Sequence, residues 1–282
     1  MIRLKRKPEW LKKKIDFDKS QQTATLLNSL GVHTVCKEAK CPNIGECFRN
    51  KHATFLILGK YCTRRCLFCN VEKTRPLELD TKEPHKVASA VKELQLKHAV
   101  ITSVTRDDLK DGGASIFAQT VQEIKKISQK ISIELLIPDF KADQNALKTV
   151  CASNPDIIGH NLETIHRLYH LRPQANYQKS LGVLKFIKDI DKDIYTKSAL
   201  MLGLGETENE VIETMRDLRQ YECDFLSLGQ YLRPSLKHVE VAEYIKPEQF
   251  EHYKTIALKL GFKHAESAPY ARSSYHAQKY LE

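Results

Sequence analysis

Short apolar runs alternate with longer amphipathic stretches through most of the chain. Each run is rich in β-branched or aliphatic residues, and a segment of helical periodicity follows it. This alternation predicts parallel strands joined by right-handed helical crossovers. The predicted strands cover 53–58, 99–104, 131–137, 156–159, 195–202 and 224–228, and the clearest predicted helices cover 86–94, 116–127, 181–190 and 208–218.

Six such strands favour an α/β fold in which the sheet curves into an incomplete (β/α)6 barrel. We expect three parts along the chain. Residues 1–50 form an N-terminal extension, residues 51–262 form the partial barrel, and residues 263–282 form a C-terminal tail.

Polar residues and glycines gather where the predicted strands end. Parallel barrels place their active sites at the carboxyl ends of the strands, so these segments predict a site on one face of the barrel. The segments are 62–69, 103–113, 160–164, 203–207 and 229–234.

Composition excludes several classes of protein. The 282 residues are 41% hydrophobic and 28% charged, which is typical of a globular chain. The longest apolar runs, such as 55–58, are too short to span a bilayer, so we expect no membrane insertion. No apolar segment follows the basic N-terminus, which indicates a cytoplasmic protein. In that reducing compartment, clustered thiols favour metal or redox chemistry over disulfides.

The formal net charge is +10, which favours an anionic partner. Lys and Arg make up half of residues 1–14, a segment that is either a solvated stretch or a docking surface for an acidic partner. Trp10 and Leu11 predict that this segment is anchored onto the folded body.

Six of the eight cysteines fall between Cys36 and Cys69. Cys62, Cys66 and Cys69 follow the first predicted strand with the spacing C-x3-C-x2-C. Three thiolates on one loop can hold three irons of a 4Fe–4S cluster and leave the fourth iron open to a ligand. A zinc site is the alternative, but it usually needs a fourth protein ligand nearby.

This loop, in this position, resembles that of the radical S-adenosylmethionine (SAM) superfamily, and Phe68 before the last cysteine matches the same pattern. The resemblance implies that SAM binds the open iron. It also implies that one electron from the reduced cluster cleaves SAM, and that the resulting 5′-deoxyadenosyl radical removes hydrogen from unactivated C–H bonds.

Cys36, Cys41 and Cys47 form a second triplet with the spacing C-x4-C-x5-C. Buried structural thiols are the alternative for this triplet. Together the two triplets resemble the lipoyl synthase family, and the resemblance runs from Lys7-Pro8-Glu9-Trp10-Leu11 to Arg272-Ser273-Ser274-Tyr275-His276-Ala277. Further matching segments are 102–114, 159–164 and 229–232.

The resemblance implies a sulfurtransferase of lipoate biosynthesis. Two sulfur atoms enter the sixth and eighth carbons of an octanoyl chain carried on a lysine. A second, auxiliary 4Fe–4S cluster, bound by Cys36, Cys41, Cys47 and Ser273, is consumed as the sulfur donor. A serine oxygen is a hard ligand for a soft cluster, and a labile bond suits a cluster that must be dismantled.

Contacts to SAM are expected from the strand ends. The candidates are Ser103, Asn161, Glu163 and Lys197, together with Phe68 of the cysteine loop, and Gly203 and Gly205 would allow close approach of the backbone. Helix capping and turn formation are the alternative roles for these residues.

The implied partners are octanoylated lipoyl carrier domains of two kinds, the E2 subunits of dehydrogenase complexes and the glycine cleavage H protein. A ferredoxin or flavodoxin type reductant and iron–sulfur assembly proteins are also implied. The positive charge then indicates attraction to acidic carriers and electron donors, and no nucleic acid is expected because no separate RNA-binding module fits in the chain.

Biotin synthase, a tRNA methylthiotransferase and a non-catalytic zinc protein are the competing interpretations. Biotin synthase does not account for the second triplet together with Arg272-Ser273-Ser274-Tyr275. Outside the triplets, Cys151 and Cys223 have apolar neighbours and are predicted to be core thiols, and His166 and His170 are predicted to be a surface pair.

Overall fold

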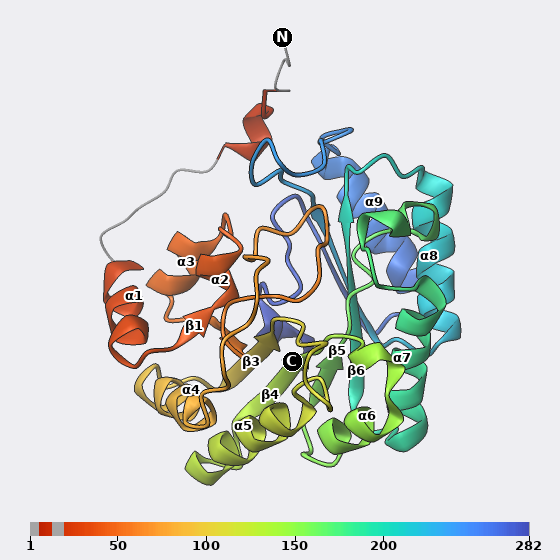
Figure 1. The fold of residues 1–282 in the computed structure, drawn as a ribbon. Coiled ribbons are helices and arrows are strands. Elements are labelled where there is room, and N and C mark those ends of the chain that lie inside the picture. The colour runs from red at the N-terminus through yellow and green to blue at the C-terminus, as the bar shows by residue number, and fades with distance from the viewer. Residues whose placement is uncertain (1–5, 13–19, 282) are drawn as a thin grey trace.

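A computed structural model describes residues 6–12 and 20–281. Eight strands form one sheet in the order β1 to β8, and the larger helices pack along its outer side (Figure 1). Within the described residues no ladder joins β8 back to β1. The barrel is therefore open along one side, as expected for an incomplete barrel.

Strands β2 to β8 are parallel, and β1 pairs antiparallel with β2. The six predicted strands are confirmed as β2 to β7. Strands β1 and β8 were not predicted because each is too short and too polar to show a strand period. The bounds are β1 His33–Thr34, β2 Thr54–Ile57, β3 His98–Ser103, β4 Ser132–Leu136, β5 Ile157–Gly159, β6 Tyr195–Leu202, β7 Phe225–Gln230 and β8 His264–Ser267.

The four predicted helices are confirmed as α4, α5, α7 and α8. Side-chain caps from Asp143, Asn176 and Thr207 satisfy free backbone amides at the starts of α6, α7 and α8. The helix bounds are α1 Ser20–Ser29, α2 Val35–Glu38, α3 Ile44–Arg49, α4 Glu83–Glu93, α5 Ala114–Ile127, α6 Gln144–Cys151, α7 Tyr177–Ile190, α8 Glu208–Gln220 and α9 Pro247–Lys259. Short 3-10 helices are η1 Glu9–Leu11, η2 Phe140–Ala142, η3 His166–Leu171 and η4 Ala277–Tyr280.

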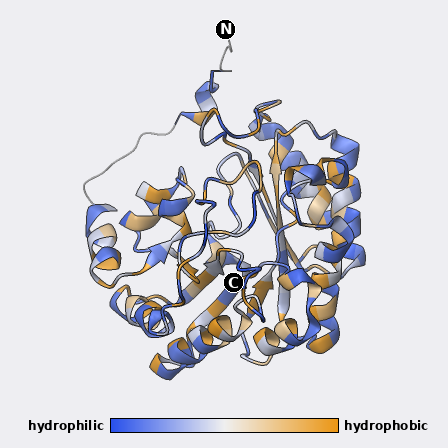
Figure 2. Ribbon diagram, in the orientation of Figure 1, coloured by the Kyte–Doolittle hydropathy of each residue, from blue (hydrophilic) through white to orange (hydrophobic). Residues whose placement is uncertain are grey.

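The main core lies between the sheet and the outer helices. Hydrophobic residues concentrate on the strands and on the helix faces that cover them, and the outer helix faces are hydrophilic (Figure 2). Cys151 and Cys223 are buried in this core, which confirms their prediction as packing residues. None of the helices in the described part of the chain has the length and apolar composition needed to cross a membrane.

Segments near the two ends of the described chain contact each other. The Tyr270 hydroxyl donates to the Leu11 carbonyl, and the Asn43 side chain donates to the Tyr270 carbonyl. Leu11 is buried while Trp10 is exposed, so Leu11 supplies the predicted anchor. The basic residues among 1–5 and 13–14 lie outside the described residues.

Candidate functional site

The loop carrying Cys62, Cys66 and Cys69 follows β2 and is held by backbone hydrogen bonds to several other segments. The Cys62 amide donates to the Glu72 carbonyl at 2.9 Å. The Thr63 amide donates to the Thr105 carbonyl after β3, and the Leu67 amide donates to the carbonyl of Leu171 in η3. The loop therefore lies at the carboxyl ends of the strands, where the sequence predicted the site.

Arg64, inside the same loop, is buried and carries the densest set of side-chain contacts there. Its guanidinium pairs with both oxygens of Asp107 at 2.8 and 3.1 Å and with both oxygens of Asp139 at 2.6 and 2.7 Å. Burial raises the pKa of Asp139, but the Arg64 hydrogen bonds outweigh it and lower that pKa to about 2. Two bidentate ion pairs thus fix the loop to the segments that follow β3 and β4.

Burial favours the protonated form of two thiols in this loop, Cys66 and Cys69. Burial raises the pKa of Cys66 and raises that of Cys69 to about 12. Arg172 acts against this effect by lowering the pKa of Cys66. A bound metal cluster would displace these protons, and a nearby cation would offset the negative charge of the thiolates.

The segment after β5 brings polar groups towards the loop. Glu163 has a left-handed backbone with φ of +66°, and its amide donates to the Ala199 carbonyl on β6. Its carboxylate accepts from the Asn161 side chain at 3.0 Å. This conformation is uncommon for a residue with a side chain, and here it orients Glu163 beside Asn161.

Four polar atoms near the carboxyl ends of β3 and β5 are buried without a partner among the described residues. They are Oγ of Ser103, at the end of β3, Nε2 of His160 and Oγ1 of Thr164, in the segment after β5, and Nε of Arg172, in the segment after η3. Burying a polar atom without a partner costs about 1–3 kcal/mol, so these atoms fit a site that receives a polar ligand.

Lys197 does not belong to this group, which corrects its predicted contact with SAM. Its side chain is fully buried near the start of β6, and its ammonium lies 2.9 and 3.0 Å from the two oxygens of Glu134. The Lys197 ammonium also lies over the ring of Tyr280, 3.7 Å from the centre of that ring. Lys197 therefore neutralises a buried carboxylate inside the barrel, away from the strand ends.

The predicted role of Gly203 also changes. Its φ is +97°, and a Cβ there would lie 2.3 Å from both the Gln230 side chain and the Glu243 carbonyl. Protein atoms thus occupy the space that a side chain would need. Gly205, with φ of +106°, has only Ala242 within ordinary contact distance and leaves more room.

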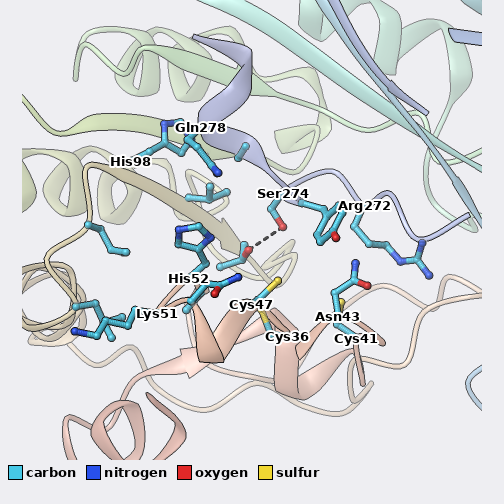
Figure 3. Close-up of a pocket in the computed structure, with 18 of the residues that line it drawn as sticks. Cys36, Cys41, Asn43, Cys47, Lys51, His52, His98, Arg272, Ser274 and Gln278 are labelled. Carbon is cyan, nitrogen blue, oxygen red and sulfur yellow. Dashed lines mark hydrogen bonds between the residues drawn. The ribbon is translucent and has the colours of Figure 1, made fainter. Parts of the chain in front are cut away.

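The second triplet surrounds a cavity of about 460 Å³ at the open side of the barrel (Figure 3). Cys36 lies on α2, Cys47 lies on α3, and Cys41 lies in the turn between them. Burial and the neighbouring Cys41 raise the pKa of Cys36 to about 11. Among the described residues, no three His, Cys, Asp or Glu side chains are placed to hold a single metal ion.

The C-terminal motif reaches this cavity. Arg272 and Ser274 line it together with the cysteines, and Ser274 accepts a hydrogen bond from the Thr54 hydroxyl at 2.7 Å. Ser273 points elsewhere, because its hydroxyl donates to the side-chain oxygen of Asn161 at 3.1 Å. The role of Ser273 as a cluster ligand therefore stays a prediction.

The two cysteine sites are neighbours in space. A chain of hydrogen bonds runs from Ser273 to Asn161 and on to Glu163. Arg272 lines the cavity of the second triplet, and burial lowers its pKa while Glu163, in the segment after β5, acts to raise it. Residues far apart in sequence thus form one continuous polar region between the triplets.

Several residues of this region were not predicted. Arg64 and its acidic partners are 43 and 75 positions apart, and Arg172 contacts the loop only through the fold. The sequence signal for Arg64 was its place between two cysteines of the motif. Nothing local indicated Asp139 or Arg172.

Comparisons with known proteins identify the class. The radical SAM superfamily pattern matches residues 56–218. Similar folds occur in the crystal structure of methylornithine synthase (PylB), with a TM-score of 0.57 at 16% identity over 87% of this chain and 74% of that one. The FeFe-hydrogenase maturase HydG from Carboxydothermus hydrogenoformans gives a TM-score of 0.58 at 13% identity, over 80% of this chain and 64% of that one. Fold and cysteine loop together define a radical SAM protein.

Closer relatives specify the family. The chain is 56% identical to lipoyl synthase of Geotalea uraniireducens (strain Rf4) over 279 residues, which is 99% of each chain. It is 54% identical to lipoyl synthase of Caldanaerobacter subterraneus subsp. tengcongensis over 273 residues, or 96% of each chain. The chain belongs to the lipoyl synthase family of radical SAM enzymes, which confirms the resemblance seen in the sequence.

Proposed function

We propose that the protein inserts two sulfur atoms into an octanoyl chain, at the sixth and eighth carbons, while the chain is attached to a lysine of a lipoyl carrier domain. Membership of the lipoyl synthase family supports this function. The observation that carries it is that Arg272 and Ser274 of the C-terminal motif line one cavity with the N-terminal cysteine triplet, while Ser273 between them bonds Asn161 in the segment after β5.

Cys62, Cys66 and Cys69 would hold a 4Fe–4S cluster, and Ser103, Asn161 and Glu163 would contact SAM. The donor set fits, because three thiols share one fixed loop and the Ser103 hydroxyl lacks a protein partner in the described structure. When bound, the reduced cluster supplies the electron that cleaves SAM, and the auxiliary cluster supplies the sulfur.

Two arginines, Arg172 and Arg272, would favour cluster binding at the two cysteine triplets. The charge of Arg172 lowers the pKa of Cys66, and Arg272 lines the cavity that Cys41 also lines. These cations would balance the thiolates that form when a cluster binds. Burial of Cys36 would limit the access of water to reactive species at the second triplet.

For the auxiliary cluster, we propose Cys36, Cys41, Cys47 and Ser273 as ligands. Ser273 would have to leave Asn161 and turn towards the cavity, a change that would also release the Asn161 side chain. Ser274 already lines that cavity, so it is the rival for this role.

The function is tested by incubating the enzyme anaerobically with an octanoylated carrier domain, SAM and a reductant. The product carrier is then weighed by mass spectrometry. Two added sulfurs are expected, and a carrier of unchanged mass would contradict the proposal. Cys41→Ala should abolish sulfur insertion while retaining SAM cleavage, whereas Cys66→Ala should abolish both.

The two serines can be separated by a matched pair of variants. We expect Ser273→Ala to lower lipoyl formation at least tenfold, and Ser274→Ala to lower it only a fewfold because the Thr54 hydrogen bond is lost. Ser273→Cys should bind iron but turn over poorly, since a thiolate releases iron less readily than a serine oxygen. The reverse ranking of the two alanine variants would assign the ligand to Ser274.

The proposed partners are the E2 subunits of dehydrogenase complexes and the glycine cleavage H protein as carriers. A ferredoxin or flavodoxin would supply electrons, and iron–sulfur assembly proteins would load the clusters in the cytoplasm. The net charge of +10 supports acidic partners of this kind.

A further inference from the structure

The cavity around the second triplet extends beyond the cysteines to the surface of the protein. Lys51, His52 and Lys97 line its outer end and are exposed, whereas Cys36 and Asn43 are buried along it. In Figure 3, Lys51 and His98 lie at one end of the cavity and Arg272 lies at the other. The cavity thus has a solvent end and an inner end.

The solvent end lies on the opposite face of the barrel from the radical site. Lys51 and His52 come just before β2, and Lys97 comes just before β3, so all three sit at the amino ends of parallel strands. The Cys62 loop follows the carboxyl end of β2. We call the outer end, lined by Lys51, His52 and Lys97, the rear opening.

The rear opening is positively charged. Within the described residues, neither Lys51 nor Lys97 forms an ion pair. Burial lowers the pKa of His52, so the two lysines carry the charge. Glu46, an acid beside Cys47 in sequence, accepts a hydrogen bond from the Tyr275 hydroxyl.

A route of this kind has a chemical use if the auxiliary cluster is dismantled in each turnover. Iron must leave the site, and iron and sulfide must return to it. The carbon chain and SAM would fill the strand-end face while the clusters react. A separate opening allows exchange at the cysteines without passage through the radical site.

We propose that the rear opening admits small anions, of the class of sulfide and of carboxylate ligands that carry iron, to the second cysteine triplet. This inference rests on the proposed function for its purpose, but the opening itself is tested by iron exchange. Lys51 and Lys97 attract such anions, and the buried part of the cavity passes them to Cys36 and Cys47.

The test uses the full chain with Cys62→Ala, Cys66→Ala and Cys69→Ala, so that bound iron reports only on the second triplet. The probe is EDTA, an anionic chelator, and the loss of cluster absorbance is followed anaerobically. We expect Lys51→Glu with Lys97→Glu to slow iron release at least fivefold at low salt, and the difference to shrink at high salt.

Lys92→Glu is the matched control, because Lys92 is an exposed lysine on α4 that does not line the cavity. It should release iron at the parent rate. The neutral chelator 2,2′-bipyridine should extract iron from all variants at similar rates. Equal rates with EDTA for the double variant and its parent, or equal slowing by Lys92→Glu, would overturn the proposal.

Should the double variant fail to bind iron, Lys51→Gln with Lys97→Gln provides the same comparison with a smaller change. The proposed function is examined separately in the chain with all cysteines intact. There the double variant should complete its first sulfur insertion at the parent rate. A parent that inserts no sulfur would contradict the proposed function, while the EDTA rates would still decide the opening.

Discussion

Arg64 shows how one side chain can position a whole cofactor loop. Its two carboxylate partners come from different segments, and Asp139 is presented by a turn in which Phe140, Lys141 and Ala142 all have positive φ, at 45°, 55° and 63°. Such residues cost about 1–3 kcal/mol each. The buried ion pairs would offset that strain, and we interpret Arg64 as a positioning residue.

Replacing Arg64 with Gln should therefore weaken the radical-site cluster. Removing one partner of a buried ion network costs about 3–5 kcal/mol, and two carboxylates would be left without their cation. We expect a lower iron content and an altered EPR spectrum of the reduced cluster.

Arg65→Gln is the control for this variant, because Arg65 is the exposed neighbour in the same loop. It should keep the parent iron content and spectrum. Equal behaviour of the two variants would show that Arg64 does not position the loop.

His160 couples stability to pH. It is buried beside Asp139, and burial together with Arg172 lowers its pKa to about 4 from an ordinary value of 6.5. Between these two values the unfolded chain binds a proton that the folded chain does not bind. Stability is therefore fully present above about pH 6.5 and is lost as the pH falls towards 4.

Lowering the pH from 7.5 to 6.0 should cost about 1 kcal/mol through this group. Urea unfolding at the two pH values measures the change. His160→Gln should reduce the pH dependence by that amount, and an unchanged slope would show that folding does not lower the pKa of His160.

The C-terminal segment is held at two points that follow its serines. Tyr275 donates to the Glu46 carboxylate on α3, and Tyr280 in η4 hydrogen-bonds to Ser227 on β7 inside the barrel. These contacts join the tail to the N-terminal extension and to the sheet. The position of Ser273 and Ser274 therefore depends on elements at both ends of the chain.

Tyr280→Ala should destabilise the protein by about 3–5 kcal/mol, because removing this buried ring leaves a cavity inside the barrel. It should also lower the iron held by the second triplet more than the iron held by the first. Tyr280→Phe retains the ring and loses only the hydroxyl, so about 1 kcal/mol and no loss of iron is expected.

Unfolding curves and iron analysis of single-triplet variants distinguish these outcomes. Equal loss of iron from both triplets in Tyr280→Ala would mean that the tail acts on general stability and has no specific effect on the auxiliary site.

The charge of the whole molecule sets its expected response to salt. A net charge of +10 and acidic carrier domains would attract each other over about 10 Å at an ionic strength of about 0.1 M, and over a longer distance at lower salt. We expect the KM for an intact carrier domain to rise severalfold, on the order of 2- to 10-fold, between about 50 and 300 mM salt. Salt screens the attraction between the two proteins and so slows their association. The KM for a short, uncharged octanoyl-lysine peptide should change little, and equal changes for both substrates would contradict electrostatic docking.

The class of fold and the location of the chemistry followed from local sequence patterns. Strands β2 to β7 have apolar runs that need no partner to be recognised, and Cys62, Cys66 and Cys69 lie within one loop. A cluster site whose ligands all lie in one short segment can therefore be predicted from the spacing of those ligands.

Contacts between distant segments depended on the tertiary structure. Lys197 pairs with the buried Glu134 on β4. Arg64 pairs with Asp139, which is 75 positions away in sequence, and Ser273 donates a hydrogen bond to Asn161, which is 112 positions away. Which side chains meet is set by the curvature of the sheet and by the packing of the segments near the two ends of the described chain. No local period carries that information, because the free energy that selects such contacts arises only when the whole barrel is assembled.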